Sequence, residues 1–254
     1  VRYFHDVDTY SVDLHAPMYR PLRNISYVLD WSLAGPSPFW FHAHNLLLHA
    51  VNACIVVWLL RLVAGVAHTH KPTQDRPPVS ALACLVATML WLAHPVHTEA
   101  VAWIKSRDEM LFALFYLAAV GVWLDAIRLR SFGPARTAAI VVLSVLSLLS
   151  KEMAVSLPLV VLAAGVYFAD RRDSARVLRV SALVFAVAIG FVLARHLVIG
   201  KTQQQSFLAG SWFAQMLTMT RVAMRYVGLA LAPAGLKVSY DDLAISRSLS
   251  DWRV

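Results

Sequence analysis

Long apolar runs alternate with short polar segments along the chain. The runs cover residues 39–63, 79–93, 109–125, 137–149, 153–169, a stretch ending near 199, and 212–231. A helix needs roughly 20 apolar residues to cross about 30 Å of hydrocarbon, and fewer inside a bundle. The pattern therefore predicts an all-α polytopic membrane protein with six to seven transmembrane helices. The mixed polar and aromatic segment 1–41 is expected to be an extramembrane loop, and so is 64–78.

A dense polar stretch, residues 94–110, separates the second and third runs and holds two of the three glutamates in the sequence. Pro95 suits the first position of a helix, where its missing N–H has no consequence. Apolar residues then recur at helical spacing on one side. We therefore expect a short helix at the membrane surface after the second span. Ser106 and Glu109 have the spacing of a capping box for the next helix.

Composition excludes a soluble domain. The chain is 59% hydrophobic and 15% charged, with a mean hydropathy of +0.60, which is typical of an integral membrane protein. The net charge of +8 does not indicate a nucleic-acid partner, because the basic residues lie in short segments between the spans. There, membrane orientation and lipid headgroups explain them, and no nucleic-acid-binding motif is present.

The basic residues predict the orientation. Ten of the 23 lysines and arginines cluster on one side, which the positive-inside rule makes cytoplasmic: Arg61, Lys71, Arg76, Arg128, Arg130, Arg136, Arg171, Arg172, Arg176 and Arg179. All three glutamates then lie on the opposite, outer side. Because Ala, Val and Arg are abundant, we expect a bacterial inner membrane, with this outer side toward the periplasm.

Two polar stripes interrupt the apolar runs. His42, Asn45, His49 and Asn52 follow a 3, 4, 3 spacing that places them on one helix face. This face is predicted either to form a hydrogen-bond ladder to a neighbouring helix or to line a wet cavity. In the run 212–231, Arg221 and Arg225 form a second stripe with Gln215 and Thr218. This helix is predicted either to lie along the outer interface or to face a polar cavity.

Several residues on the outer side are candidates for chemistry. Lys105, Arg107 and Lys151 lie beside predicted helix N-termini, where phosphate binds readily, although interfacial cations also anchor helices generally. His94, His97 and Glu99 lack a fourth ligand, so no metal site is predicted; a divalent ion is left open as a cofactor. Asp6 and Asp8 either act as a general base toward a hydroxyl or keep the first loop solvated.

A set of motifs in a fixed order resembles a known family: Tyr19-Arg20-Pro21-Leu22, Phe41-His42 with Asn45, Leu48-His49, His94-Pro95-Val96-His97-Thr98-Glu99-Ala100-Val101 with Arg107 and Glu109, and Leu149-Ser150-Lys151-Glu152. Together they resemble the membrane domain of the transmembrane and tetratricopeptide-repeat-containing protein O-mannosyltransferases and their bacterial relatives. The His-Pro-Val-His-Thr-Glu run is the most specific of these motifs.

The resemblance implies a membrane glycosyltransferase. Its partners would be a polyprenyl-phosphate sugar donor, a protein hydroxyl as acceptor and the lipid bilayer, and an inverting transfer would occur on the non-cytoplasmic face. The implied catalytic base is Asp6 or Asp8. The residues implied to bind substrate or lipid phosphate are Arg20, His42, His49, His94, His97, Glu99, Lys105, Arg107, Lys151, Glu152, Arg221 and Arg225.

The resemblance also implies a domain division: an outer-face loop at 1–41, a multispanning glycosyltransferase-like domain at 42–231 and a truncated polar segment at 232–254. The family's first transmembrane helix and its C-terminal repeats are not found in the sequence, so we expect an inactive fragment of a longer enzyme. The alternative is a polytopic transporter or flippase. A transporter should place polar groups near mid-membrane and on both sides, whereas here they crowd one surface.

Overall fold

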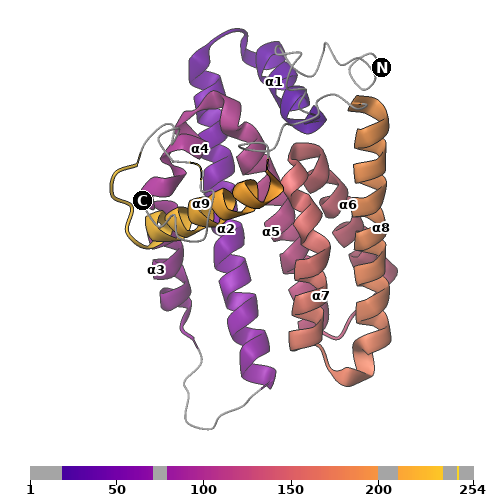
Figure 1. Ribbon diagram of the computed structural model, residues 1–254. Helices are drawn as coiled ribbons and strands as arrows, with labels where there is room; N and C mark the ends of the chain where they lie inside the picture. Colours follow the sequence, from indigo (N-terminus) through magenta and orange to yellow (C-terminus); the bar gives the residue numbers. More distant parts are fainter. Residues whose placement is uncertain (1–18, 71–78, 200–210, 237–244, 246–254) are drawn as a thin grey trace.

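The computed structural model describes residues 19–70, 79–199, 211–236 and 245, and these residues are mostly helical and include no strand (Figure 1). The all-α prediction is therefore confirmed for them. The longer helices are α1 (Pro21–Ala34), α2 (Pro38–His70), α3 (Ala81–Leu92), α5 (Arg107–Arg128), α6 (Pro134–Ser150), α7 (Leu157–Phe168), α8 (Ser174–Ile199) and α9 (Trp212–Leu231). Short turns of helix connect them: η3 (Pro95–His97), α4 (Thr98–Ala102), η4 (Ile104–Ser106), η5 (Glu152–Ser156) and η6 (Arg171–Asp173).

Helix α5 is central in the bundle, because α2 and α6 both pack along it and α7 also contacts it. Helices α6 and α7 in turn contact α8. Helix α9 runs across the direction of these helices in Figure 1. Its steep angle fits the first of the two arrangements predicted for the second polar stripe, a helix lying along a surface.

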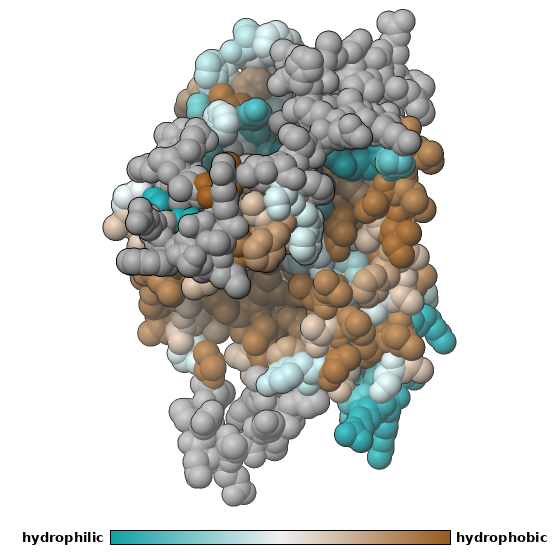
Figure 2. All heavy atoms as spheres, viewed as in Figure 1, coloured by the Kyte–Doolittle hydropathy of each residue, from teal (hydrophilic) through white to brown (hydrophobic). Residues whose placement is uncertain are grey.

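Three of the described helical stretches are long and apolar enough to cross a membrane: Pro38–Val66, Ile104–Arg128 and Arg171–Leu197. A fourth would be the pair Ala81–Leu92 and Pro95–Ala102, which bends by 49° at its break. Figure 2 shows brown apolar side chains across the middle of the visible face, with teal polar ones at both ends. These features establish an integral membrane protein with three to four candidate spans in the described ranges.

The interior is built around Trp123 of α5, which is completely buried. Its indole Nε1 donates a hydrogen bond of 2.8 Å to the carbonyl oxygen of Val161 on α7, so its one polar atom is satisfied. Gly165 on α7 lets the ring approach closely, because a Cβ there would lie 3.0 Å from Trp123 and 2.5 Å from Val177. The aromatic ring thus joins α5, α7 and α8.

Helices α2 and α5 meet at a second close contact. An added Cβ at Gly121 of α5 would lie only 2.1 Å from the Trp58 ring of α2. We expect Gly121→Ala to destabilise the protein by about 1–3 kcal/mol, because overpacking forces the ring or the helices apart. Thermal unfolding in detergent measures this effect.

Gly190→Ala on α8 is the matched control, since a Cβ at Gly190 meets no atom within 4 Å. That change should be neutral or mildly stabilising, as alanine favours a helix over glycine. Equal destabilisation by the two substitutions would contradict the close Trp58 contact.

Three local predictions are corrected. Helix α2 continues to His70, beyond the expected end near 63. Helix α1 lies within the segment expected to be a loop. The capping box is not formed, because the Ser106 backbone has φ −82° and ψ 12° and its side chain makes no cap hydrogen bond. The 3₁₀ turn η4 leads directly into α5, so Ser106 lacks the extended backbone of a capping residue, and Glu109 pairs elsewhere.

Candidate functional site

A network of ion pairs lies at the end of the bundle where α1 packs against the beginning of α5. Arg20 is its centre. Its guanidinium group donates to both carboxylate oxygens of Glu152, with Nε to Oε2 at 3.2 Å and Nη2 to Oε1 at 2.9 Å, and Nη1 contacts Asp108. Arg20 immediately precedes Pro21, which begins α1. The start of α1 therefore fixes an arginine between two other helical segments.

A second ion pair is formed by the sequence neighbours of the two carboxylates that contact Arg20. Lys151 contacts Glu109, and these residues directly adjoin Glu152 and Asp108. The Lys151 side chain is 12% exposed, whereas those of Glu109 and Glu152 are about 40% exposed. Two cations and three carboxylates thus gather where α6 ends and α5 begins, and the two glutamates open this group to solvent.

The ion pair of Arg20 and Glu152 is held in its charged form by electrostatic interactions. Burial alone would raise the pKa of Glu152, but the hydrogen bond from Arg20 and the charges of Arg20 and Arg195 bring that pKa below its ordinary value. Burial tends to lower the pKa of Arg20, and its carboxylate partners raise it overall. The site is therefore strongly polarised rather than neutral.

Arg107 is the most buried charged side chain of this region, with no exposed surface. It forms an ion pair of 2.5 Å with Asp30 on α1 and donates to Asn45 Oδ1 at 2.9 Å and to the Phe41 carbonyl at 3.0 Å. Its guanidinium carbon lies 4.7 Å from the centre of the Tyr27 ring. Arg107 therefore joins α1, α2 and α5, and it does so next to Asp108, the partner of Arg20.

Three members of the stripe on α2 form the predicted inter-helix ladder. Asn52 donates to the Met110 carbonyl at 3.0 Å, His49 Nε2 lies 3.1 Å from the Leu92 carbonyl, and Asn45 accepts from Arg107. All three are buried, whereas His42 is exposed. The stripe thus serves helix packing over most of its length, and only His42 faces outward.

The histidines of the polar stretch 94–110 gather around Trp91. The His97 ring centroid lies 4.6 Å from that of Trp91, 5.5 Å from that of His49 and 6.2 Å from that of His94. The Nδ1 atom of His94 accepts a hydrogen bond from the Val96 N–H and so caps the turn at Pro95. Polar rings from α2 and from the stretch after α3 therefore form one patch.

The other predicted site residues that the structure describes lie on α4, η4 and α9. Glu99 and Lys105 are exposed, and the Lys105 ammonium lies 5.5 Å from the Trp103 ring centre. Arg221 and Arg225 are partly buried on α9. Asp6 and Asp8 lie outside the described residues. No group of three histidine, cysteine, aspartate or glutamate side chains in the described part of the chain is arranged to hold a metal ion.

Sequence reasoning missed three charged members of this region. Asp108 and Asp30 are the buried partners of Arg20 and Arg107, and Arg195 on α8 acts on Glu152 through its charge. The Nε atom of Arg195 is buried and has no hydrogen-bond partner among the described residues. A charged residue near the end of a long apolar helix was the available signal for Arg195. No local signal distinguishes Asp30, because it lies in the mixed polar and aromatic segment 1–41, which predicts a solvated loop.

Three relatives with similar sequences indicate the kind of protein to which this chain is related. Mouse protein O-mannosyl-transferase TMTC4 is 37% identical over 101 residues, which are 39% of this chain and 13% of that protein. The chain is similar to protein O-mannosyl-transferases. Tmtc2 of Drosophila melanogaster is 33% identical over 147 residues, 56% of this chain and 14% of the relative. F38B6.6 of Caenorhabditis elegans is 27% identical over 241 residues, 92% of this chain and 32% of the relative.

These relatives support the family that the sequence motifs resemble. The matched regions span between 13% and 32% of the three relatives. All three come from animals, so they do not support the expected bacterial origin. No family model matches the chain, and no solved structure matches it.

Proposed function

We propose that this chain belongs to a membrane glycosyltransferase that transfers a mannose-like sugar from a polyprenyl-phosphate carrier to a protein hydroxyl on the non-cytoplasmic face. The names of the relatives support a glycosyltransferase acting on protein. The observation that carries the proposal is the gathering of Arg20 and Lys151 with their carboxylate partners at one end of an apolar bundle. A lipid-linked donor presents its phosphate at such a boundary.

In the proposed reaction, the phosphate of the carrier leaves as the sugar bond to the acceptor forms. Arginine binds phosphate through paired N–H groups, and lysine binds it as a point charge. Arg20 and Lys151 would exchange part of their contacts with Glu152 and Glu109 for the donor phosphate. Their positive charge would then stabilise the negative charge that develops on the leaving group. Asp6 or Asp8 would remove the proton from the acceptor hydroxyl.

The patch of histidines is proposed to shape the sugar end of this site, with Glu99 exposed beside it. We expect His97→Ala and Glu99→Ala, each made in the complete protein, to lower sugar transfer by roughly 100-fold or more. The measurement is transfer of radiolabelled mannose from polyprenyl-phosphate mannose to protein in membranes. His196→Ala, an exposed histidine at the end of α8, is the control and should retain activity.

Full transfer activity in both variants would move the site away from the polar stretch. If variants at Arg20, Lys151, His97 and Glu99 all leave sugar transfer unchanged but several of them abolish uptake of a polar solute into vesicles, the protein would instead be a transporter.

We further propose six membrane crossings, formed by α2, the bent α3–α4 pair, α5, α6, η5 with α7, and α8. Pro134–Ser150 and Glu152–Phe168 are shorter apolar helices. At 1.5 Å per residue, each is about 25 Å long, which suffices within a bundle. The arginine-rich ends between α5 and α6 and between α7 and α8 would face the cytoplasm. In a bacterial inner membrane, the active face at the other end would then face the periplasm.

This topology predicts the location of fused reporters. A reporter placed after Gly133 should be active only in its cytoplasmic form, and one placed after Lys151 only in its external form. The same side for both reporters would remove α6 as a span, and exchanged sides would invert the orientation of the whole chain.

A further inference from the structure

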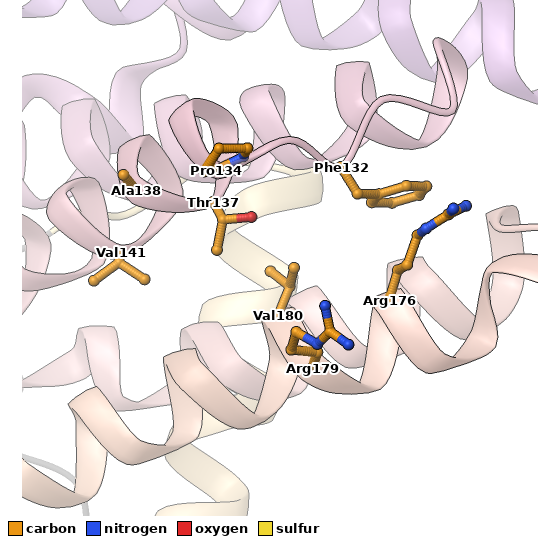
Figure 3. A pocket seen from close by; sticks show the side chains of 8 residues that line it. All are labelled: Phe132, Pro134, Thr137, Ala138, Val141, Arg176, Arg179 and Val180. Atoms are coloured by element: carbon orange, nitrogen blue, oxygen red, sulfur yellow. The ribbon is translucent and has the colours of Figure 1, made fainter.

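A groove of about 460 Å³ opens at the opposite end of the bundle, between the beginnings of α6 and α8. Figure 3 shows that Thr137 and Val180 approach each other across it, and that Arg176 and Arg179 extend along its α8 side. The groove is lined by Phe132, Pro134, Thr137, Ala138, Val141, Arg176, Arg179 and Val180. It is separate from the outer site described above.

The lining changes from charged to apolar along the groove. Helices α6 and α8 both begin at this end of the bundle, so their first turns carry Pro134 and Arg176, whereas Val141 lies farther into the apolar band and Val180 is buried between the helices. The seven residues from Pro134 to Val141 advance about 10 Å along the helix. A ligand that fits this lining has an anionic end at the surface and an apolar end directed into the membrane.

The charged end has unused capacity for an anion. Arg179 is exposed, and no ion pair or hydrogen bond joins it to another described residue. Arg176 pairs with Asp173 at 2.5 Å, and its guanidinium carbon lies 5.9 Å from the centre of the Phe132 ring. The residue before α6, Gly133, provides no side-chain cap for the first N–H groups of the helix, so that terminus adds a positive dipole end.

The surroundings reinforce this charge. The described residues at this end include seven arginines and three aspartates: Arg128, Arg130, Arg136, Arg171, Arg172, Arg176, Arg179, Asp125, Asp170 and Asp173. The aspartates are engaged by Arg128, Arg130, Arg136 and Arg176. The excess of positive charge therefore remains available at the groove, and it favours a lipid headgroup of negative charge.

We propose that this groove binds one anionic phospholipid from the leaflet at the arginine-rich end, with its phosphate beside Arg179 and Arg176 and an acyl chain along Val141 and Val180. A volume of about 460 Å³ is within the range of ligand sites and accommodates the headgroup with part of one chain. The lipid would fill the space between α6 and α8 and join their cytoplasmic ends.

Native mass spectrometry of the purified protein, titrated with phosphatidylglycerol or phosphatidylcholine in detergent, tests the proposal. We expect one phosphatidylglycerol to bind preferentially and Arg179→Gln to weaken that binding about fivefold, with a larger loss when Arg176→Gln is added. Arg172→Gln is the matched control, since it removes the same charge from the same end but outside the groove. It should leave the affinity within about twofold of the parent, because its charge acts only through solvent.

Ala138→Phe separates a fitted site from a charged surface. Ala138 is exposed on α6 and lines the groove, so a phenyl ring there should fill the space without changing any charge and should also weaken phosphatidylglycerol binding. Equal loss in Arg172→Gln and Arg179→Gln, or unchanged binding in Ala138→Phe, would overturn the proposal. Arg179 has no described partner to lose, so the Arg179→Gln result does not depend on a folding defect; an unshifted melting temperature confirms this.

Discussion

Replacing Arg107 with alanine is expected to destabilise the protein by about 3–5 kcal/mol, because the change removes the cation paired with the buried Asp30 carboxylate and leaves it, among the described residues, only His44, whose Nδ1 lies 2.8 Å away. Asp30 is only 10% exposed and lies 2.5 Å from the Arg107 guanidinium group. Asn45 and the Phe41 carbonyl would each lose a hydrogen bond as well. Thermal unfolding in detergent, followed by tryptophan fluorescence, measures the loss.

Arg128→Ala is the control for this experiment. Arg128 also pairs with an aspartate, but its side chain is 44% exposed and its partner is three residues away on the same helix. Such a surface pair contributes about 0–1 kcal/mol. If the two variants unfolded at the same temperature, Arg107 would not join α1 to the bundle as described. Arg107→Lys should recover only part of the loss, because an ammonium group cannot replace the planar guanidinium.

Replacing Arg20 with glutamine in the complete protein is expected to lower sugar transfer by roughly 100-fold or more, while membrane insertion is retained. The reason is that Arg20 is the proposed phosphate ligand, and removal of one preorganised donor to a developing negative charge has an effect of this size. The loss should appear in kcat as well as in the KM for polyprenyl-phosphate mannose, since a ligand of the leaving group acts mainly in the transition state.

Arg130→Gln is the matched control for Arg20. Arg130 likewise bridges two carboxylates, Asp170 and Asp173, at 3.0 and 3.1 Å, but it does so at the opposite end of the bundle. Its replacement should leave sugar transfer close to that of the parent protein. Equal losses in the two variants would indicate a general effect of ion pairs on stability, and full activity in Arg20→Gln would remove Arg20 from the proposed site.

Helix α1 illustrates a limit of sequence patterns. It contains apolar residues that remain exposed, such as Val28 and Trp31, while Arg23 and Ser26 are buried. This arrangement is the reverse of a soluble amphipathic helix, and the mixed polar and aromatic residues of the segment 1–41 had predicted a loop instead. Helix α1 is stabilised by contacts with the rest of the chain, including the hydrogen bond of 2.7 Å from the Tyr27 hydroxyl to the Ile104 carbonyl.

The positions of the apolar helices were accessible from the sequence alone, because a helix that crosses lipid must satisfy its backbone internally and carry a long apolar run. The run at 212–231 corresponds to α9, and the run at 137–149 lies within α6. The chemical character of the polar stretch 94–110 was also readable, because charged residues near lipid are rare enough to stand out.

Which polar groups meet was decided only by the tertiary structure. Arg20 reaches carboxylates that are 88 and 132 residues away in the chain, and no local periodicity encodes such a pairing. The same holds for Arg107, whose partners come from α1 and α2. An ion pair depends on distance and burial, and both follow from how the helices pack rather than from the residue types that each helix carries.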